Sequence, residues 1–369
     1  MNWYELTNVG EIDSPALLIY PDRVQHNINT MVATVGGNTK RLIPHVKTHK
    51  MAEILAMQLA AGISRFKCAT IAELEMCLAT GAKWVLMSYQ LTGPKINRFI
   101  QLVKRYPEAT ISSLTDNLAA ATALAAAFKE AGLTAKVFLD LNNGMNRTGL
   151  PLNEETFTTF QNINAIDHLN LVGIHVYDGH IRNPIFEERK KESDAALLPL
   201  YKLIEQIAAA SLPKPEVITG GSPSFTSAAL RAEFYCSPGT TLLWDSGYSQ
   251  IVPEMDLQCA AVLLTRVISK PAEGLITVDL GHKSVAAENT IDKRVTFLNL
   301  TDYQPVSQSE EHLVLRIKDW AAVQVGDILY CIPYHVCPSV ALHDIAQVVR
   351  NNARVAEWNV VARKRKITV

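Results

Sequence analysis

The stretch Arg41-Leu-Ile-Pro-His-Val-Lys47-Thr-His-Lys50 decides how the rest of the chain is interpreted. Residues 41–46 can form a short strand, which ends in Lys47, a polar turn and a long apolar-periodic helix. A lysine at the carboxyl end of a buried strand can lose hydration, which lowers its pKa and frees the amine for a Schiff base. A lone lysine is more often a surface residue whose stem lies along apolar groups, so this prediction depends on the neighbouring sequence.

Apolar strands and amphipathic helices alternate through the first two thirds of the chain. After an initial strand at residues 15–20, we expect strands at 41–46, 65–69, 84–88, 110–114, 136–141, 169–177, 216–219 and 233–236. Gly62, Gly81 and Gly132 each end a helix, and Asp116 is the expected N-cap of the helix at 117–131. Continuously apolar strands separated by such helices indicate a parallel sheet buried on both faces. Eight strand–helix units predict an α/β fold of the (β/α)8 TIM barrel type, with catalytic groups at the carboxyl ends of the strands. A doubly wound open sheet is the alternative, and the strand count argues against it.

The pattern changes near Leu257. From there to the end, segments rich in Val, Ile, Leu and Thr follow one another without a convincing helix. We therefore predict a barrel domain over residues 12–248 and an all-β domain over 249–369, which residues 1–11 join.

Two glycine-containing loops follow the seventh and eighth expected strands. The first holds Thr219, Gly220, Gly221 and Ser222, and the second ends in Gly239-Thr240. Glycines let backbone N–H groups approach an anion, and hydroxyls add further donors. Because barrel enzymes commonly bind phosphate with the loops after strands seven and eight, these loops predict a phosphate site.

Further polar side chains follow the fifth and sixth strands. Arg147 lies on a glycine-flanked loop, from which it could bind a phenolate or carboxylate oxygen; an arginine that only braces the loop is the alternative. His175 and Tyr177 alternate along the sixth strand and should face the same side, although Tyr177 could equally be a core residue. His180, in the next loop, is a candidate acid or base.

In the β domain, His335 and Cys337 follow a strand. In an extended segment these two residues would share a face, so that imidazole and thiolate could bind one metal with positions left open for substrate. From spacing alone an unliganded pair is the more common interpretation. His343-Asp344 lies near enough in sequence to support such a site.

The composition excludes several classes of protein. The 369 residues are 48% hydrophobic and 19% charged with a net charge of −1, which gives no electrostatic reason to expect nucleic acid or an anionic membrane as a partner. The six cysteines show no regular spacing, as is typical of reduced thiols. No signal sequence or membrane span is visible. We expect a soluble, cytoplasmic protein.

The motif Pro44-His-Val-Lys47-Thr-His49, together with the glycine loops and the His335-x-Cys337 pair, resembles the D-threonine aldolase and D-serine dehydratase family. These are pyridoxal 5'-phosphate (PLP) enzymes of fold type III, related to alanine racemase. The resemblance implies that Lys47 carries PLP, that Arg147 contacts its phenolate and that Tyr177 lies against its ring. It places the phosphate on Gly220–Ser222 and Gly239-Thr240. His335 and Cys337 would bind a divalent metal, Zn or Mn, that contacts the substrate's β-hydroxyl.

This resemblance implies a PLP- and metal-dependent lyase acting on β-hydroxy D-amino acids, and the expected protein partner is a second copy of the chain in a homodimer. Lys47 is the natural base for Cα, and either dehydration or retro-aldol cleavage could follow. Asn183 stands where bacterial D-threonine aldolases tend to have a histidine, and the His-x-Cys pair resembles the dehydratase form. Both features favour dehydration, although His180 could replace the missing base. The alternatives are an amino-acid racemase and a non-catalytic PLP-binding protein.

Overall fold

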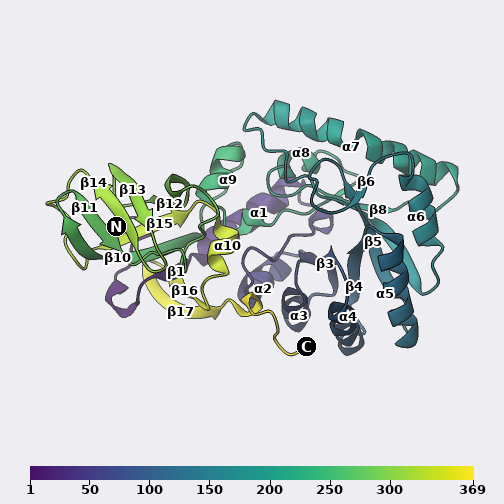
Figure 1. Ribbon diagram of the computed structural model, residues 1–369, viewed down its shortest axis with the longest axis horizontal. Coiled ribbons are helices and arrows are strands. Elements are labelled where there is room, and N and C mark those ends of the chain that lie inside the picture. The colour runs from purple at the N-terminus through teal and green to yellow at the C-terminus, as the bar shows by residue number, and fades with distance from the viewer. The chain divides into compact units, whose positions relative to one another are not determined.

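The computed structural model describes all 369 residues, which form two compact units. The barrel unit contains residues 31–47, 55–239 and 364–369, and the β unit contains residues 1–30, 48–54 and 240–363. Figure 1 labels their helices and strands. No helix combines the length and apolar character needed to cross a membrane.

A parallel sheet forms the inside of the barrel unit. Its strands, in spatial order, are β2 (Arg65–Cys68), β3 (Trp84–Gln90), β4 (Thr110–Thr115), β5 (Ala135–Asn142), β7 (Leu169–Val176), β8 (Glu216–Thr219) and β9 (Tyr235–Cys236), and the two-residue β6 (Leu150–Pro151) pairs with β5. A buried cluster fills the interior: Ile43, Leu86, Leu114, Phe138 and Ile218. The nearly complete burial of these strands explains their continuous apolar sequence.

The segment before Lys47 closes this sheet. Leu42 forms a parallel bridge with Cys236 of β9, and His45 forms one with Lys67 of β2. Around them, Ile43 N donates to Cys236 O at 2.8 Å, and Val46 N donates to Lys67 O at 2.9 Å. The expected strand at 41–46 is therefore present only as two isolated bridges, because Pro44 has no N–H to donate. It nevertheless lies between the first and last strands, so the predicted barrel is confirmed.

Helices alternate with the strands, and Figure 1 shows α3, α4 and α5 outside β3, β4 and β5. The helices up to residue 229 are α1 (Pro21–Thr34), α2 (Ala52–Ala60), α3 (Ile71–Ala79), α4 (Pro94–Arg105), α5 (Leu118–Glu130), α6 (Thr156–Asn164), α7 (Phe186–Ala209) and α8 (Phe225–Ala229). The N-cap of α5 is Asn117, whose side chain accepts from Ala120 N at 3.1 Å, and the assignment to Asp116 was wrong. Asp116 instead accepts from Gly149 N at 3.0 Å.

The β unit contains a second, mostly antiparallel sheet. Its main path is β13 (Tyr303–Gln308), β14 (Leu313–Ile317), β11 (Leu275–Val278), β10 (Ala261–Ala272), β1 (Ala16–Ile19), β16 (Ile345–Arg350) and β17 (Ala353–Asn359), while β15 (Ile328–Pro333) pairs with β10 and with β12 (Val295–Phe297). The strand at 15–20, which the sequence analysis placed with the barrel, thus pairs with β10 and β16. A short helix, α10 (Val336–Val340), interrupts the region after Leu257 where we expected none, and another, α9 (Ser246–Ile251), precedes that region.

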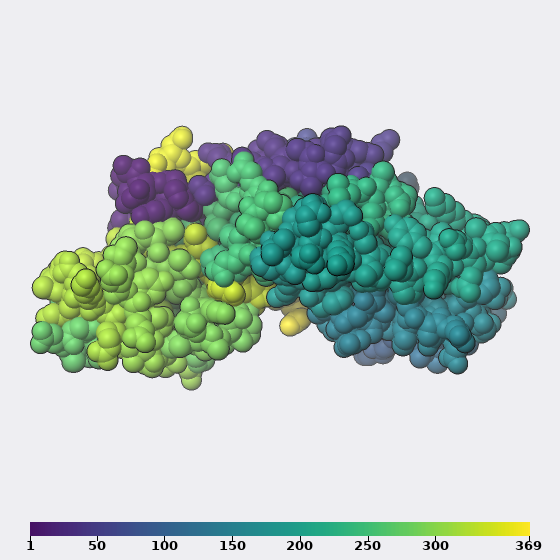
Figure 2. All heavy atoms as spheres, turned by 90° about the horizontal axis from the view of Figure 1, so that it is seen from above, coloured from purple at the N-terminus to yellow at the C-terminus, as the bar shows by residue number.

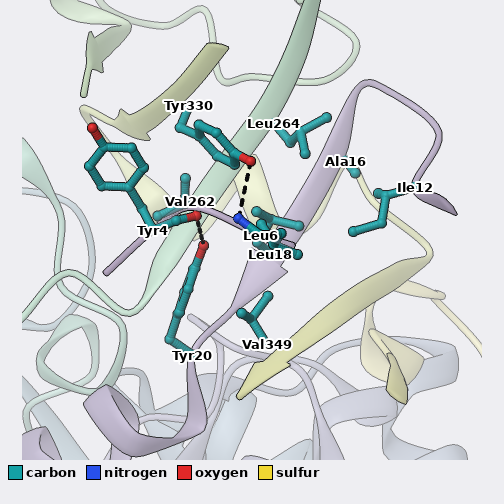
Figure 3. Packing of buried hydrophobic residues seen from close by; sticks show 10 residues of the cluster. All are labelled: Tyr4, Leu6, Ile12, Ala16, Leu18, Tyr20, Val262, Leu264, Tyr330 and Val349. Carbon is teal, nitrogen blue, oxygen red and sulfur yellow. Dashed lines mark hydrogen bonds between the residues drawn. The ribbon is translucent and has the colours of Figure 1, made fainter. Parts of the chain in front are cut away.

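The two ends of the β unit's sequence pack together. Thr7 N donates to Asn352 O at 2.8 Å, and Figure 2 shows purple N-terminal residues beside yellow-green ones. In the apolar cluster of Figure 3, the Tyr20 hydroxyl donates to Tyr4 O at 2.7 Å, and Leu6 N donates to the Tyr330 hydroxyl at 3.4 Å. The N-terminal residues are therefore an integral part of this sheet's core.

Candidate active site

A cavity of about 510 Å³ opens at the carboxyl ends of the barrel strands, a volume within the usual range of small-molecule sites. Lys47 and Arg147 both line it. The other lining residues are His45, Ala69, Ser88, Tyr89, Gln90, Thr92, Leu114, Asp116, Asp140 and Thr148. The cavity thus occupies the end of the barrel at which enzymes of this fold place their active sites.

The closing segment determines where Lys47 lies. Its backbone N donates to His45 Nδ1 at 3.2 Å, and His45 Nε2 lies 3.3 Å from Ser88 Oγ on β3. The Lys47 amine is 5.9 Å from the centre of the Tyr177 ring. The structure therefore brings Lys47 and Tyr177, two residues predicted from the sequence, to the same place.

Arg147 reaches the same ring from the loop after β5. Asn146 in this loop has a left-handed backbone (φ 53°), as do its flanking glycines. Asn142 Oδ1 accepts from Asn146 N at 2.9 Å, and Thr148 Oγ1 donates to Asp140 Oδ2 at 2.9 Å. The Arg147 guanidinium lies 4.8 Å from the centre of the Tyr177 ring. The loop is therefore held by hydrogen bonds on both sides of the arginine.

The sequence analysis missed a second lysine beneath this cavity. Lys67 of β2 is buried, and its amine lies 3.4 Å from His175 Nε2 and 5.8 Å from the centre of the Tyr177 ring. His175 Nδ1 lies 2.7 Å from Asp140 Oδ1. His175 and Tyr177, which we expected to face the same side, thus both lie near the Lys67 amine. A lysine between the apolar residues Phe66 and Cys68 of a strand was the signal in the sequence that could have identified Lys67.

Burial strongly affects the protonation of these groups. The pKa of Lys67 falls to about 7, first through burial and then through the charge of Lys47. The pKa of His175 is also lowered, again by burial first and then by Lys67, although its bond to Asp140 opposes the shift. His175 is therefore neutral near pH 7 and donates its Nδ1 proton to Asp140.

The loop after β8 is built around a buried carboxylate. Asp178 Oδ1 accepts from Gly221 N at 3.2 Å and from Ser224 Oγ at 2.5 Å. Gly220 has φ +73°, and a Cβ there would lie 2.4 Å from that of Ala228, so only glycine fits. Gly239 N donates to Ser222 Oγ at 3.1 Å, which joins the two predicted phosphate loops.

Two hydroxyls at the ends of these strands are buried without a protein hydrogen-bond partner: Thr219 Oγ1 and Ser237 Oγ. Buried polar groups are nearly always paired, so each such group requires an explanation. A phosphate, with its several acceptor oxygens, would supply the missing partners. The barrel unit thus fits the phosphate, the covalent lysine and the phenolate contact that PLP requires.

The other predicted residues lie apart from this cavity's lining. His180 is exposed, and a Cβ placed on Gly144 would lie 2.8 Å from its Nε2, so it packs against the start of the Arg147 loop. Thr240 belongs to the β unit, where its hydroxyl is 3.5 Å from Cys337 Sγ. Thr48 Oγ1 lies 3.1 Å from the same sulfur.

His335 and Cys337 are together, but not in the extended geometry that we expected. His335 is the N-cap of α10 and Cys337 lies in its first turn, and their side chains form a hydrogen bond. Burial alone would lower the pKa of His335, but the bonds to Cys337 and Glu288 raise it to about 9. His343, expected to support the pair, instead bonds Ser284 O at 2.8 Å.

Two carboxylates that the sequence analysis missed hold this pair. Glu288 Oε1 lies 2.6 Å from His335 Nδ1, and Asp245 Oδ2 accepts from Val336 N at 2.9 Å. No group of three or more His, Cys, Asp and Glu side chains could hold a metal by itself. The donor set is therefore an imidazole and a thiol, which suit a zinc-like metal, with the imidazole oriented by a carboxylate.

Comparison with known proteins accounts for both units. Residues 19–246 match the family model "Alanine racemase, N-terminal domain". The chain belongs to this alanine racemase family. Residues 260–349 of this alanine racemase-family chain match a second model, "Putative serine dehydratase domain". The family predicted from the Lys47 motif and the His335-x-Cys337 pair is thereby confirmed.

Several known proteins are similar to this chain over nearly their whole length. A 3-hydroxy-D-aspartate aldolase of Paracoccus denitrificans is 27% identical, covering 96% of this chain and 93% of that protein. A D-threo-3-hydroxyaspartate dehydratase of Delftia is 25% identical, covering 94% and 97%. The crystal structure of a D-threonine aldolase from Filomicrobium marinum superposes with a TM-score of 0.86 at 26% identity, covering 95% and 96%.

Proposed function

We propose that this chain is a PLP-dependent lyase that acts on β-hydroxy D-amino acids, with Lys47 as the residue that holds the cofactor. The main support for the proposal is the arrangement of Lys47 and Arg147. Both line the cavity at the carboxyl ends of the strands, and both have their charged groups near the ring of Tyr177. The aldolases and the dehydratase to which the chain is similar are named for substrates of this class.

Different residues of the barrel unit would bind different parts of PLP. The Lys47 amine would hold its aldehyde carbon and the Arg147 guanidinium its phenolate oxygen, while the Tyr177 ring lies against the pyridine. Gly220, Gly221, Ser222 and Gly239, with the unpaired hydroxyls of Thr219 and Ser237, would hold the phosphate. When bound, PLP supplies an electron sink that makes the proton on Cα of an amino acid removable.

The chain's own groups then move the protons. The amine of Lys47, once free, accepts the Cα proton, and Arg147 keeps a negative oxygen in place with its fixed fork of donors. His180 is proposed as the acid or base for the β-hydroxyl. His335 and Cys337 are proposed to hold a divalent metal, which when bound supplies a Lewis acid for a hydroxyl oxygen.

Whether the β-hydroxyl leaves or Cα–Cβ breaks distinguishes a dehydratase from an aldolase. The test is to mix PLP- and metal-loaded protein with D-threonine, D-serine and 3-hydroxy-D-aspartate and to identify the products by mass. Dehydration of D-serine gives pyruvate and ammonia, and that of 3-hydroxy-D-aspartate gives oxaloacetate and ammonia. Retro-aldol cleavage gives glycine, with acetaldehyde from D-threonine or glyoxylate from 3-hydroxy-D-aspartate.

Lys47→Arg is the control for the covalent role, because it keeps the charge and cannot hold the cofactor. After borohydride reduction, the wild-type protein should carry the pyridoxal group on Lys47, and the variant should carry none. A Lys47→Arg protein that is still labelled, or a labelled wild-type protein that releases none of these products, would refute the proposal. Loss of optical rotation from alanine would favour a racemase instead.

A cytoplasmic location and a homodimer complete the proposal. All six cysteines are free thiols in the structure, as is typical of a reducing compartment. Light scattering on the protein as it elutes from a size-exclusion column would give its molar mass and so test the proposed dimer.

A further inference from the structure

The proposed reaction assigns no task to Lys67, whose amine is buried beneath the cavity. Its side chain, 3% exposed, points into the barrel from β2. The amine lies 3.4 Å from His175 Nε2 and 5.8 Å from the centre of the Tyr177 ring. The Lys47 amine and the Arg147 guanidinium lie 5.9 Å and 4.8 Å from the same ring centre.

Two carboxylates that face Lys67 brace the two loops proposed to bind the ligand. One carboxylate oxygen of Asp140 accepts a hydrogen bond from His175 Nδ1, and the other accepts one from the hydroxyl of Thr148, the neighbour of Arg147. Asp178 accepts from Gly221 N and from Ser224 Oγ in the phosphate loop. Lys67 is therefore coupled by charge to both loops.

The charges around Lys67 nearly balance. The groups that face it are Lys47, Arg147, Asp140, Asp178, the neutral His175 and the Tyr177 ring. Two cations and two carboxylates cancel, so the protonation of Lys67 decides whether this part of the barrel is neutral or carries one net positive charge. Burial and the charge of Lys47 lower the pKa of Lys67 to about 7, so its proton exchanges near neutral pH.

We propose that Lys67 is a proton-linked positioning residue: it takes up one proton from solvent when an anionic ligand such as the PLP phosphate enters the barrel mouth, and it releases that proton when the ligand leaves. The identity of the ligand rests on the proposed function. An added negative charge stabilises the ammonium form of Lys67, and by reciprocity the ammonium form binds the anion more tightly.

The hydrogen-bond chain transmits this charge to the loops. A protonated Lys67 donates to His175 Nε2, which fixes the proton of His175 on Nδ1 and directs it to Asp140. Asp140 then keeps two donors, one of them Thr148 in the Arg147 loop. Uptake of the proton therefore fixes the loop that carries Arg147 at the moment when the anion is bound.

The experiment measures protons by calorimetry on the full-length chain freed of PLP. The probe is pyridoxine phosphate, which has the phosphate and the ring but no aldehyde to react with Lys47. Titrations in two buffers of different ionisation enthalpy give the number of protons taken up on binding. Lys67→Met removes the charge at nearly constant length, and Lys136→Met, at an exposed position of β5, is the matched control.

At about pH 8, above the pKa of Lys67, wild-type protein and the Lys136→Met control should take up nearly one proton more than Lys67→Met. At about pH 5.5, where Lys67 is already protonated, this difference should vanish. Above about pH 7 the affinity of the wild-type protein should fall by up to about tenfold per pH unit relative to that of Lys67→Met.

Equal proton uptake by wild-type protein and Lys67→Met at about pH 8 would overturn the inference. If Lys67→Met does not fold, Lys67→Gln keeps a donor for His175 without the charge, and the same comparison applies. These outcomes are independent of the borohydride test: absence of label on Lys47 contradicts the proposed function, whereas unchanged proton uptake contradicts only the role of Lys67.

Discussion

The hydroxyl of Ser224 donates to Oδ1 of Asp178 at 2.5 Å, and both side chains are fully buried. Because the same carboxylate oxygen also accepts from Gly221 N, this pair fixes the turn that brings the backbone of the proposed phosphate loop into place. A loop whose glycines would otherwise move freely is thus held by one hydroxyl and one carboxylate.

Removal of that hydroxyl should destabilise the protein. Ser224→Ala leaves the buried Asp178 carboxylate with one donor fewer, which should lower the free energy of unfolding by about 1.5–3 kcal/mol. Urea unfolding measures this change. Ser113→Ala is the control, because Ser113 is equally buried but its hydroxyl has no partner. A loss as large in Ser113→Ala as in Ser224→Ala would contradict the account.

A methyl group on Gly221 should displace Tyr177. A Cβ at this position would lie 2.6 Å from the Tyr177 ring, so the ring must rotate away from Lys47 and Arg147. An off-rotamer side chain costs up to about 1.5 kcal/mol, so Gly221→Ala should weaken PLP binding by about tenfold. Fluorescence titration with PLP measures this. Gly10→Ala, where nothing lies within 4 Å of the added Cβ, should bind PLP as the wild-type protein does.

Loss of the Glu288 carboxylate should weaken metal binding without disturbing the barrel unit. Glu288 lies 2.6 Å from His335 Nδ1 and directs the other ring nitrogen to the proposed metal. Removal of such a partner typically costs about 10- to 100-fold in metal affinity, which we expect for Glu288→Ala. Competition with a chromophoric chelator measures the zinc affinity. Glu273→Ala, an exposed carboxylate between β10 and β11, serves as the control; equal affinities of the two variants would contradict the role of Glu288.

His49 should make the protein sensitive to acid. Its pKa falls to about 3 because it is buried, and Met51 N donates to its Nδ1 at 3.1 Å. Between about pH 6.5 and 3 the unfolded chain therefore binds a proton that the folded chain does not, so stability falls as the pH falls. This single group contributes a slope of up to about 1.4 kcal/mol per pH unit.

Urea unfolding at several pH values checks this prediction. His49→Asn, which has no titrating group, should lose stability less steeply than the wild-type protein below about pH 6.5. Parallel curves for the two proteins would show that His49 is not the responsible group. The pKa of His343 is also lowered by burial, but His343 is present in both proteins and cannot account for a difference between them.

The sequence by itself determined the alternation of strands and helices, the change to a β domain and the importance of the segment that ends in Lys47. These features are local, because each strand or helix shows its own burial pattern over a few neighbouring residues. The strand at 15–20 was nevertheless assigned to the wrong sheet. Its apolar sequence indicates that it is buried but does not indicate which strand it pairs with.

Only the tertiary structure decided which distant residues meet. The bridges from Leu42 to Cys236 and from His45 to Lys67 close the barrel over separations that no local pattern encodes. The same closure turns Lys67 of β2 toward His175, and the fold of the β unit places Glu288 on His335. Burial and neighbouring side chains shift the pKa values of Lys67, His175 and His335, and both causes exist only once the chain has folded.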